Sequence, residues 1–258
     1  MQLYHNPMSS CSQKVRLVLA EKLLDYESTI LDLQRGDQFH PDYRAVNPQA
    51  VVPTLIDNDQ YIVESTLINE YLEEQYDGIK LMPAEASARH QVRLFTKLLD
   101  ETLHPACGII SYAIGIRPNL LLLTQAEINN LLDGIPDQAR RRDREQVIRH
   151  GVKAKNFAKA LDSYLKILDR AQDCLKTQHY VVGNDISLAD FALLPYIIRL
   201  DHLALDNAIS CRPLLLEWYK RLQQRASFKI AISDWVPENT VNAFRAAGEK
   251  IKNDVYLH

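Results

Sequence analysis

The hydrophobic pattern of the chain changes near residue 77, and this change limits the possible folds more than any other feature. Before it, short runs of β-branched and aromatic residues alternate with helix-period segments. After it, apolar residues recur almost throughout at the three- and four-residue spacing of a helix face. The sequence therefore predicts an α/β domain over residues 1–77, a linker over 78–86 and an all-helical domain over 87–258.

The first 77 residues have the signals of two strand pairs. "MQLYH" and "YESTILDL" are typical of strands, and a helix that starts near Ser12 connects them in a βαβ unit. A polar stretch with room for one short helix follows. "VVPTLID" and "QYIVES" predict a hairpin with a tight turn at Asn58-Asp59. A further helix, with Ser65 as its cap, completes the order βαβ, loop, ββα.

The second part has three long helical segments. They are "RHQVRLFTKLLDETLH", "AKNFAKALDSYLKILDRAQDCL" and "SLADFALLPYIIRLDHLAL". The third is apolar nearly all round, as expected of a helix at the centre of a bundle. Ser187 and Asp190 form a capping box at its start.

Composition restricts the partners that we expect. The formal net charge is -3, and no apolar run approaches the ~20 residues that span a bilayer. The N-terminus lacks the basic and apolar regions of a signal peptide. The four cysteines are scattered without metal-ligand spacing. We therefore predict a cytoplasmic protein without a disulfide framework, a metal, a nucleic-acid partner or a membrane partner.

The block "ARRRDRE" at 139–145 is the strongest basic signal. Its four arginines could form a nucleic-acid patch, but no aromatic residues interleave with them and the chain is slightly acidic. We interpret the block as a solvated helix face.

The stretch "MSSCS" places Ser9, Ser10 and Cys11 where a helix begins. The N–H groups and dipole of a helix N-terminus stabilise a thiolate. Cys11 could be the reactive sulfur, or Ser9 or Ser10 could hold the thiolate of a bound thiol. The serines could also simply cap the helix.

Two further motifs suit a peptide ligand. A cis bond before Pro53 would turn the backbone of Val52 outward, where it could pair with an extended peptide, although a trans proline in an edge strand is also possible. Glu64 and Ser65 begin another helix, which suits an α-amino group and a carboxylate, or only an N-cap. Together, the three motifs favour a site for a short anionic thiol peptide.

With these motifs in this order, the chain resembles the cytosolic glutathione S-transferase superfamily over nearly its whole length. "SSCS", "VPT", "ES" and "ISLAD" carry the resemblance. It implies a thioredoxin-like domain followed by a helical domain, glutathione as co-substrate and a homodimer. Ser9 would then bind the glutathione sulfur with Ser10 beside it, and Cys11 matches the cysteine that resolves a glutathione adduct in dehalogenases.

The resemblance assigns the other contacts by position. Gln38 and His40 would contact the glycyl carboxylate, and Val52, before Pro53, would pair with the cysteinyl unit. The γ-glutamyl group would be bound by Glu64, Ser65 and, across a dimer, Asp100 from the first helix of the other helical domain, unless Asp100 is only a solvated helix acid. His104 and Tyr112 either line the electrophile pocket or pack in the helical core.

The subclass stays open. "SSCSQKVR" is similar to the zeta class, which includes maleylacetoacetate isomerases, and "YRAVNPQAVVPTL" is similar to tetrachlorohydroquinone dehalogenases. "FTKLLDETL" and "GIPDQARRR" are similar to bacterial β-etherases. Ala50 and Val51 replace the zeta-class lysine and glutamine, and extra residues lie around 115–155.

The resemblance thus implies a transferase that attacks a small hydrophobic electrophile by conjugation, dehalogenation or ether cleavage. A glutathione-dependent isomerase of the maleylacetoacetate type is one alternative. A non-enzymatic binding or regulatory protein with the same fold is another.

Overall fold

The computed structural model describes residues 1–255 and consists of two compact units. The first, here called the sheet unit, comprises Met1–Lys97, Cys174–Pro195 and Glu217–Val236. The second, the helical unit, comprises Leu98–Asp173, Tyr196–Leu216 and the segment from Pro237 onward. The sheet unit thus includes helices from late in the chain, while the predicted limits 1–77, 78–86 and 87–258 stay a prediction.

A four-stranded sheet in the order β2-β1-β3-β4 forms the centre of the sheet unit. Its strands are β1 (Gln2–His5), β2 (Glu27–Ile30), β3 (Thr54–Asp57) and β4 (Gln60–Val63). β1 pairs parallel with β2 and antiparallel with β3, and β3 and β4 are antiparallel. Asn58 and Asp59 have φ values of 48° and 61°, as a tight hairpin turn requires. The predicted βαβ unit and hairpin are confirmed.

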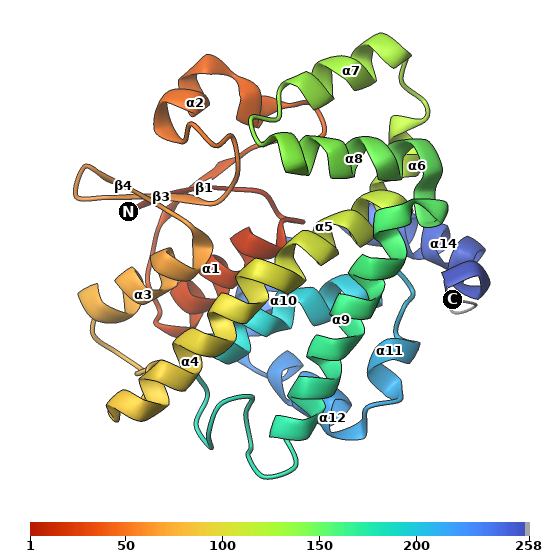
Figure 1. Ribbon diagram of the computed structural model, residues 1–258. Helices are drawn as coiled ribbons and strands as arrows, with labels where there is room; N and C mark the ends of the chain where they lie inside the picture. The colour runs from red at the N-terminus through yellow and green to blue at the C-terminus, as the bar shows by residue number, and fades with distance from the viewer. Residues whose placement is uncertain (256–258) are drawn as a thin grey trace. The chain divides into compact units, whose positions relative to one another are not determined.

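Helices cover both faces of this sheet. Figure 1 shows α1 (Ser10–Glu21) and α3 (Ser65–Gln75) on one face and α2 (Pro41–Val46) on the other. Apolar residues at helical spacing, such as Val15, Val18 and Leu19, are fully buried. A 3-10 turn, η1 (Asp37–Phe39), precedes α2. The prediction that Ser65 caps α3 is wrong by one residue, because Glu64 occupies the N-cap position and Ser65 is the first helical residue.

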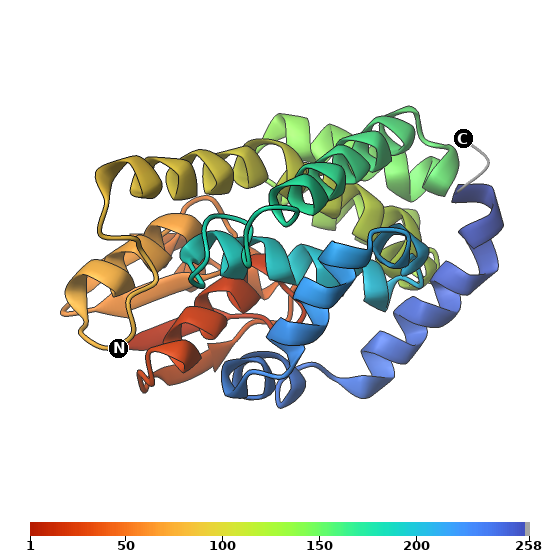
Figure 2. The same ribbon diagram turned by 90° about the horizontal axis from the view of Figure 1, so that it is seen from below.

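Later segments complete the sheet unit. They are α4 (Ala86–Leu98) up to Lys97, the first half of α10 (Leu188–His202), most of α12 (Pro213–Gln223), α13 (Ala226–Phe228) and the π-helical turn η5 (Lys229–Ser233). In Figure 2, the blue α13–η5 segment lies beside the red α1. The N-terminal helix is thereby packed against residues more than 200 positions away in sequence.

The predicted capping box at the start of α10 is confirmed. The buried Asp190 carboxylate accepts hydrogen bonds from the backbone N–H and hydroxyl of Ser187, at 2.9 and 3.1 Å. It also accepts from the N–H of Val181 at 3.1 Å and from the indole of Trp218 at 2.8 Å. Burial nevertheless raises the Asp190 pKa. The box thus fixes the preceding loop and α12 onto α10.

The helical unit is built on short and long helices joined by irregular turns. Its elements are η2 (Leu99–Leu103), α5 (His104–Ser111), η3 (Tyr112–Ile116), α6 (Arg117–Leu120), α7 (Gln125–Asp133), α8 (Gln138–His150), η4 (Gly151–Lys153), α9 (Lys155–Cys174) up to Asp173, the second half of α10, α11 (Asn207–Ser210) and α14 (Glu238–Val255). η2 and η3 are π-helical turns, which are frequent at functional sites.

Two close contacts hold the core of the helical unit. The buried Tyr164 hydroxyl donates to the carbonyl of Tyr196 at 2.6 Å. A Cβ at Gly115 would lie 2.7 Å from the Phe244 ring, so only glycine lets α14 pack this closely on η3. Within residues 1–255, the helices that the structure describes include none both long and apolar enough to cross a membrane.

Candidate functional site

Ser9, Ser10 and Cys11 lie at the N-terminus of α1 in the sheet unit. Ser9 is the N-cap, with extended backbone angles, and its half-buried Oγ accepts from the N–H of Ser12 at 3.3 Å. Ser10 is buried as the first helical residue, and Cys11 is half-buried after it. Within residues 1–255, no acceptor is found for the Ser9 hydroxyl hydrogen, so this O–H can donate to a ligand.

The Val52-Pro53 peptide bond is cis, as one of the two sequence interpretations proposed. Side chains from α2 and the loop after it support this segment. Tyr43 and Asn47 donate to the carbonyl of Val51, at 2.5 and 3.1 Å. Both also contact the hydroxyl of Thr54, at 3.0 and 3.1 Å. Hydrogen bonds from the Tyr43 and Asn47 side chains therefore fix the backbone that precedes the proline.

Glu64 has a positive φ of 67° between β4 and α3. A glutamate with a positive φ is strained, and such residues cluster at binding sites. Its side chain is exposed and makes no capping bond, whereas Ser65 is buried at the first helical position. The α3 N-terminus therefore keeps backbone N–H groups that a carboxylate could accept from.

Gln38 and His40 lie around η1 and α2. Gln38 is buried, its Nε2 donates to the carbonyl of Leu33 at 3.4 Å, and its Oε1 has no hydrogen-bond partner within residues 1–255. The exposed His40 caps α2 by accepting from the N–H of Asp42 at 3.4 Å. The predicted ligand contact of these two side chains stays a prediction.

Sequence reasoning missed a buried network behind the Ser9 loop. Arg16 of α1 donates to the carbonyls of Asn6 and Pro7, at 3.2 and 3.1 Å, and to that of Ala231 in η5 at 2.8 Å. Its Nη1 also lies 3.1 Å from Nδ1 of His5. Burial lowers the pKa of Arg16 to about 10, so it stays charged at neutral pH.

The same network keeps His5 neutral. Burial, and next the charge of Arg16, lower the His5 pKa to about 4. Nε2 of His5 lies 2.7 Å from the Ser28 hydroxyl, and its ring contacts Trp235 edge-on at 4.9 Å. The available signal was an arginine among the apolar residues of α1, but nothing in the sequence indicated its distant acceptors.

Asp100, His104 and Tyr112 lie in the helical unit, on the continuous segment η2–α5–η3. Asp100 is half-buried in a π-helical turn. His104 is exposed, with its ring centroid 6.3 Å from that of Tyr196. Tyr112 is half-buried beneath the guanidinium of Arg144, whose Cζ is 3.8 Å from the ring centroid.

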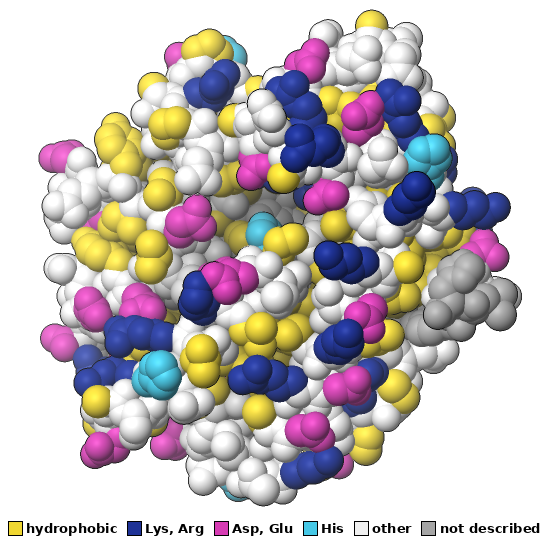
Figure 3. Space-filling model, in the orientation of Figure 1, with side chains coloured by type: hydrophobic (Ala, Val, Ile, Leu, Met, Phe, Trp, Pro, Cys, Tyr) yellow, Lys and Arg dark blue, Asp and Glu magenta, His cyan; other side chains and the backbone are white. Residues whose placement is uncertain are grey.

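This contact corrects the interpretation of the 139–145 block as a solvated face. The block does lie on a helix, α8, and Arg142 is exposed. Arg140, Arg141 and Arg144 are half-buried, however, and Arg144 packs on Tyr112. Over the face in Figure 3, Lys and Arg side chains are interspersed with Asp and Glu.

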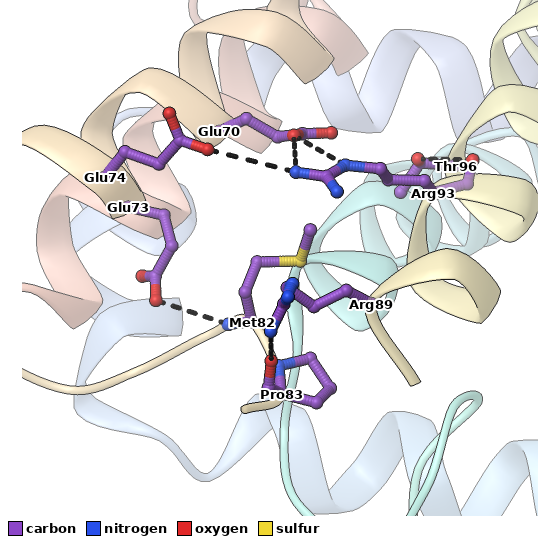
Figure 4. A network of polar contacts seen from close by, with 8 residues as sticks. All are labelled: Glu70, Glu73, Glu74, Met82, Pro83, Arg89, Arg93 and Thr96. Atoms are coloured by element: carbon purple, nitrogen blue, oxygen red, sulfur yellow. Dashed lines mark hydrogen bonds and ion pairs between the residues drawn. The ribbon is translucent and has the colours of Figure 1, made fainter. Parts of the chain in front are cut away.

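A separate groove of about 340 Å³ lies between α3 and α4 in the sheet unit. Figure 4 shows its ion pairs. Glu70 accepts from Nε and Nη2 of Arg93 at 2.9 and 2.8 Å. Glu73 accepts from Lys22 and from the N–H groups of Leu81 and Met82. Protein donors already satisfy these carboxylates, so the groove has a structural role between the two helices and is not a ligand site.

Comparison with known proteins places the chain in a family. Residues 3–80 match the model of the glutathione S-transferase N-terminal domain, and residues 137–221 match that of the C-terminal domain. Glutathione S-transferase 3 of Zea mays is 30% identical over 90% of this chain and 93% of its own length. The chain belongs to the glutathione S-transferase family. The predicted resemblance, the enzyme class and glutathione as co-substrate are thereby confirmed.

Other relatives span the subclasses that the motifs suggested. A probable maleylacetoacetate isomerase of Vibrio cholerae is 30% identical over 93% of this chain and 97% of its own. Among solved structures, β-etherase LigF of Sphingobium aligns with a TM-score of 0.82 at 24% identity, over 90% of this chain and 98% of its own. The predicted fold, a thioredoxin-like domain with a helical domain, is confirmed by this match.

Proposed function

We propose that this glutathione S-transferase holds the sulfur of glutathione at Ser9 and directs the thiolate at a small hydrophobic electrophile. The observation that carries the proposal is the position of Ser9. Ser9 is the half-buried N-cap of α1, and its hydroxyl hydrogen can be donated. A donated hydrogen bond and the positive end of α1 both stabilise a thiolate over a thiol.

We assign the remaining contacts to successive parts of the bound glutathione. The backbone of Val52, before cis Pro53, pairs with the cysteinyl unit. Ser65 and the N–H groups of α3 donate hydrogen bonds to the γ-glutamyl carboxylate, and the exposed Glu64 carboxylate binds its ammonium group. Gln38 and His40 bind the glycyl end.

Residues near the sulfur and in the helical unit complete the assignment. Ser10 supports the N-terminal turn of α1. When the reaction forms a glutathionyl adduct, the thiolate of the half-buried Cys11 attacks its sulfur, so that a mixed disulfide forms and the adduct carbon leaves with the C–S electron pair and takes up a proton. Asp100 contacts the γ-glutamyl group bound to the second copy of a dimer, and His104 and Tyr112 line the electrophile pocket.

The step itself is a nucleophilic attack. The glutathione thiol loses its proton to solvent, the thiolate forms a C–S bond with the electrophilic carbon, and the leaving group departs with its electron pair. The protein contributes the lowered thiol pKa and the orientation of the two reactants. Neither contribution requires a metal ion, and the described residues contain no cluster of three or more potential metal ligands.

We further propose a cytoplasmic homodimer. Three large apolar side chains of the sheet unit, from β4, α3 and α4, remain more than two-fifths exposed: Tyr61, Leu67 and Leu94. A second copy of the chain would cover them.

The pH dependence of conjugation tests the role of Ser9. Replacing Ser9 by Ala removes one donor to the thiolate, so kcat/KM at neutral pH should fall on the order of 10–1,000-fold and the apparent pKa of its pH profile should rise. Ser87→Ala, which removes an exposed serine hydroxyl on α4, is the matched control. An unchanged profile in Ser9→Ala would refute the proposal.

A further inference from the structure

The guanidinium of Arg144 is packed into the helical unit in a specific way. Its Cζ lies 3.8 Å above the Tyr112 ring, so the flat face of the cation rests on the aromatic face. A Cβ at Gly108, one turn before Tyr112, would come within 2.6 Å of Nη2 and 3.0 Å of Nη1. The absence of a side chain at Gly108 therefore makes room for the guanidinium against α5.

Arg144 lacks the partners that neighbouring arginines have. Arg141 pairs with Asp133 at 3.2 Å, and Arg149 pairs with Glu145 at 2.6 Å. For Arg144, the described residues 1–255 provide neither a hydrogen-bond acceptor nor a carboxylate ion pair. The adjacent Asp143 instead accepts from Asn156 at 2.9 Å.

The surroundings of Arg144 make this lack of an acceptor unfavourable. Burial lowers its pKa and Arg140 lowers it further, while Tyr112, Cys107 and Asp143 raise it. A guanidinium partly removed from water gains from an anion to which its N–H groups can donate. Stacking uses only the face of a guanidinium, so its in-plane N–H groups can still bind a carboxylate by donating two hydrogen bonds.

We propose that Arg144 binds a carboxylate carried by the electrophile, so that the preferred substrates of this transferase are anionic aromatic compounds. The inference rests on the proposed function and on Tyr112 lining the electrophile pocket. Arg144 orients the substrate through a group that does not react. The thiolate forms a C–S bond at the ring carbon that bears the leaving group, and chloride, for example, leaves with the C–Cl electron pair.

A matched pair of electrophiles tests this inference: 4-chloro-3-nitrobenzoate and its methyl ester. After division by each compound's uncatalysed rate with glutathione, the protein should prefer the benzoate by about 10-fold or more in kcat/KM, as expected of a charge-assisted contact. Arg144→Gln should abolish the preference, mainly through KM. Arg142→Gln, an equal charge change at an exposed position of the same helix, should retain it.

Gly108→Ala serves as a second variant. Its methyl group would displace the guanidinium while Arg144 itself remains, so the preference for the benzoate should fall in this variant too. Unchanged preferences in both Arg144→Gln and Gly108→Ala would overturn the inference.

A binding measurement separates this inference from the proposed function. Calorimetric titration of 3-nitrobenzoate, without glutathione, should give a Kd about 10-fold weaker for Arg144→Gln than for Arg142→Gln. Equal Kd values would overturn the anion site even if both electrophiles react. Arg144-dependent binding with no turnover of either electrophile would instead contradict the transferase function and support the anion site.

Discussion

Two arginines, one in each unit, show two uses of a buried cation. Arg16 in the sheet unit donates to three backbone carbonyls and contacts His5, so its N–H groups are matched by fixed acceptors. Arg144 in the helical unit rests on Tyr112 and has no acceptor within residues 1–255. An arginine whose N–H groups donate to backbone carbonyls stabilises the fold. An arginine whose N–H groups have no protein acceptor can bind an anionic ligand.

The largest effect is expected at Arg16. Arg16→Gln would leave the carbonyls of Asn6, Pro7 and Ala231 without their charged donor, at a cost of about 3 kcal/mol in the free energy of unfolding. Urea denaturation measures this cost, with Arg142→Gln as the exposed control. A loss below about 1 kcal/mol would show that Arg16 is not a structural clamp.

A pH effect of intermediate size is expected at His5. Its pKa is about 4 in the folded protein and 6.5 when unfolded, so the unfolded chain binds the proton more readily. The contribution to stability is complete above pH 6.5 and is lost as the pH falls toward 4. Between pH 7 and 4.5, His5→Gln should lose about 2 kcal/mol less stability than the unchanged protein.

Urea unfolding at the two pH values measures this difference. His202 in the helical unit is the natural comparison, because burial and then Arg199 and Arg245 lower its pKa to about 3. Substituting one histidine should remove only that residue's share of the pH dependence. An unaltered dependence in His5→Gln would contradict the account of the Arg16 network.

The smallest effect on stability is expected at Arg144. The stacking of a half-buried guanidinium on tyrosine contributes roughly 1 kcal/mol or less, so Arg144→Gln should unfold at nearly the same urea concentration as Arg142→Gln. A cost as large as that of Arg16→Gln would remove the contrast between the two arginines and make Arg144 a structural residue.

Local patterns predicted the elements around the site well. The βαβ order, the Asn58-Asp59 turn and the Ser187–Asp190 box depend on neighbouring residues, which a sequence shows directly. The predicted N-cap of α3 was wrong by one residue. Glu64 occupies that position with a positive φ, which side-chain preferences do not predict. The cis bond at Pro53 was one of two possibilities, and long-range contacts such as those of Tyr43 accompany it.

Long-range contacts explain what was missed. The acceptor of Arg16 in η5 is 215 positions away, and Arg144 reaches Tyr112 from a different helix. Neither contact leaves a periodic signal, so one arginine went unnoticed and the other was interpreted as solvated. Local helix-start patterns proposed Ser9 and Glu64 as ligand contacts, and family resemblance then specified which part of glutathione each would bind and added Asp100.

The most direct test of the account is the ultraviolet difference spectrum that develops when glutathione is titrated into the protein near neutral pH. We predict a saturable thiolate band that Ser9→Ala loses while it still binds glutathione, because the N-cap hydroxyl stabilises the ionised sulfur. A band of equal size in Ser9→Ala, or binding without any band in the unchanged protein, would contradict it.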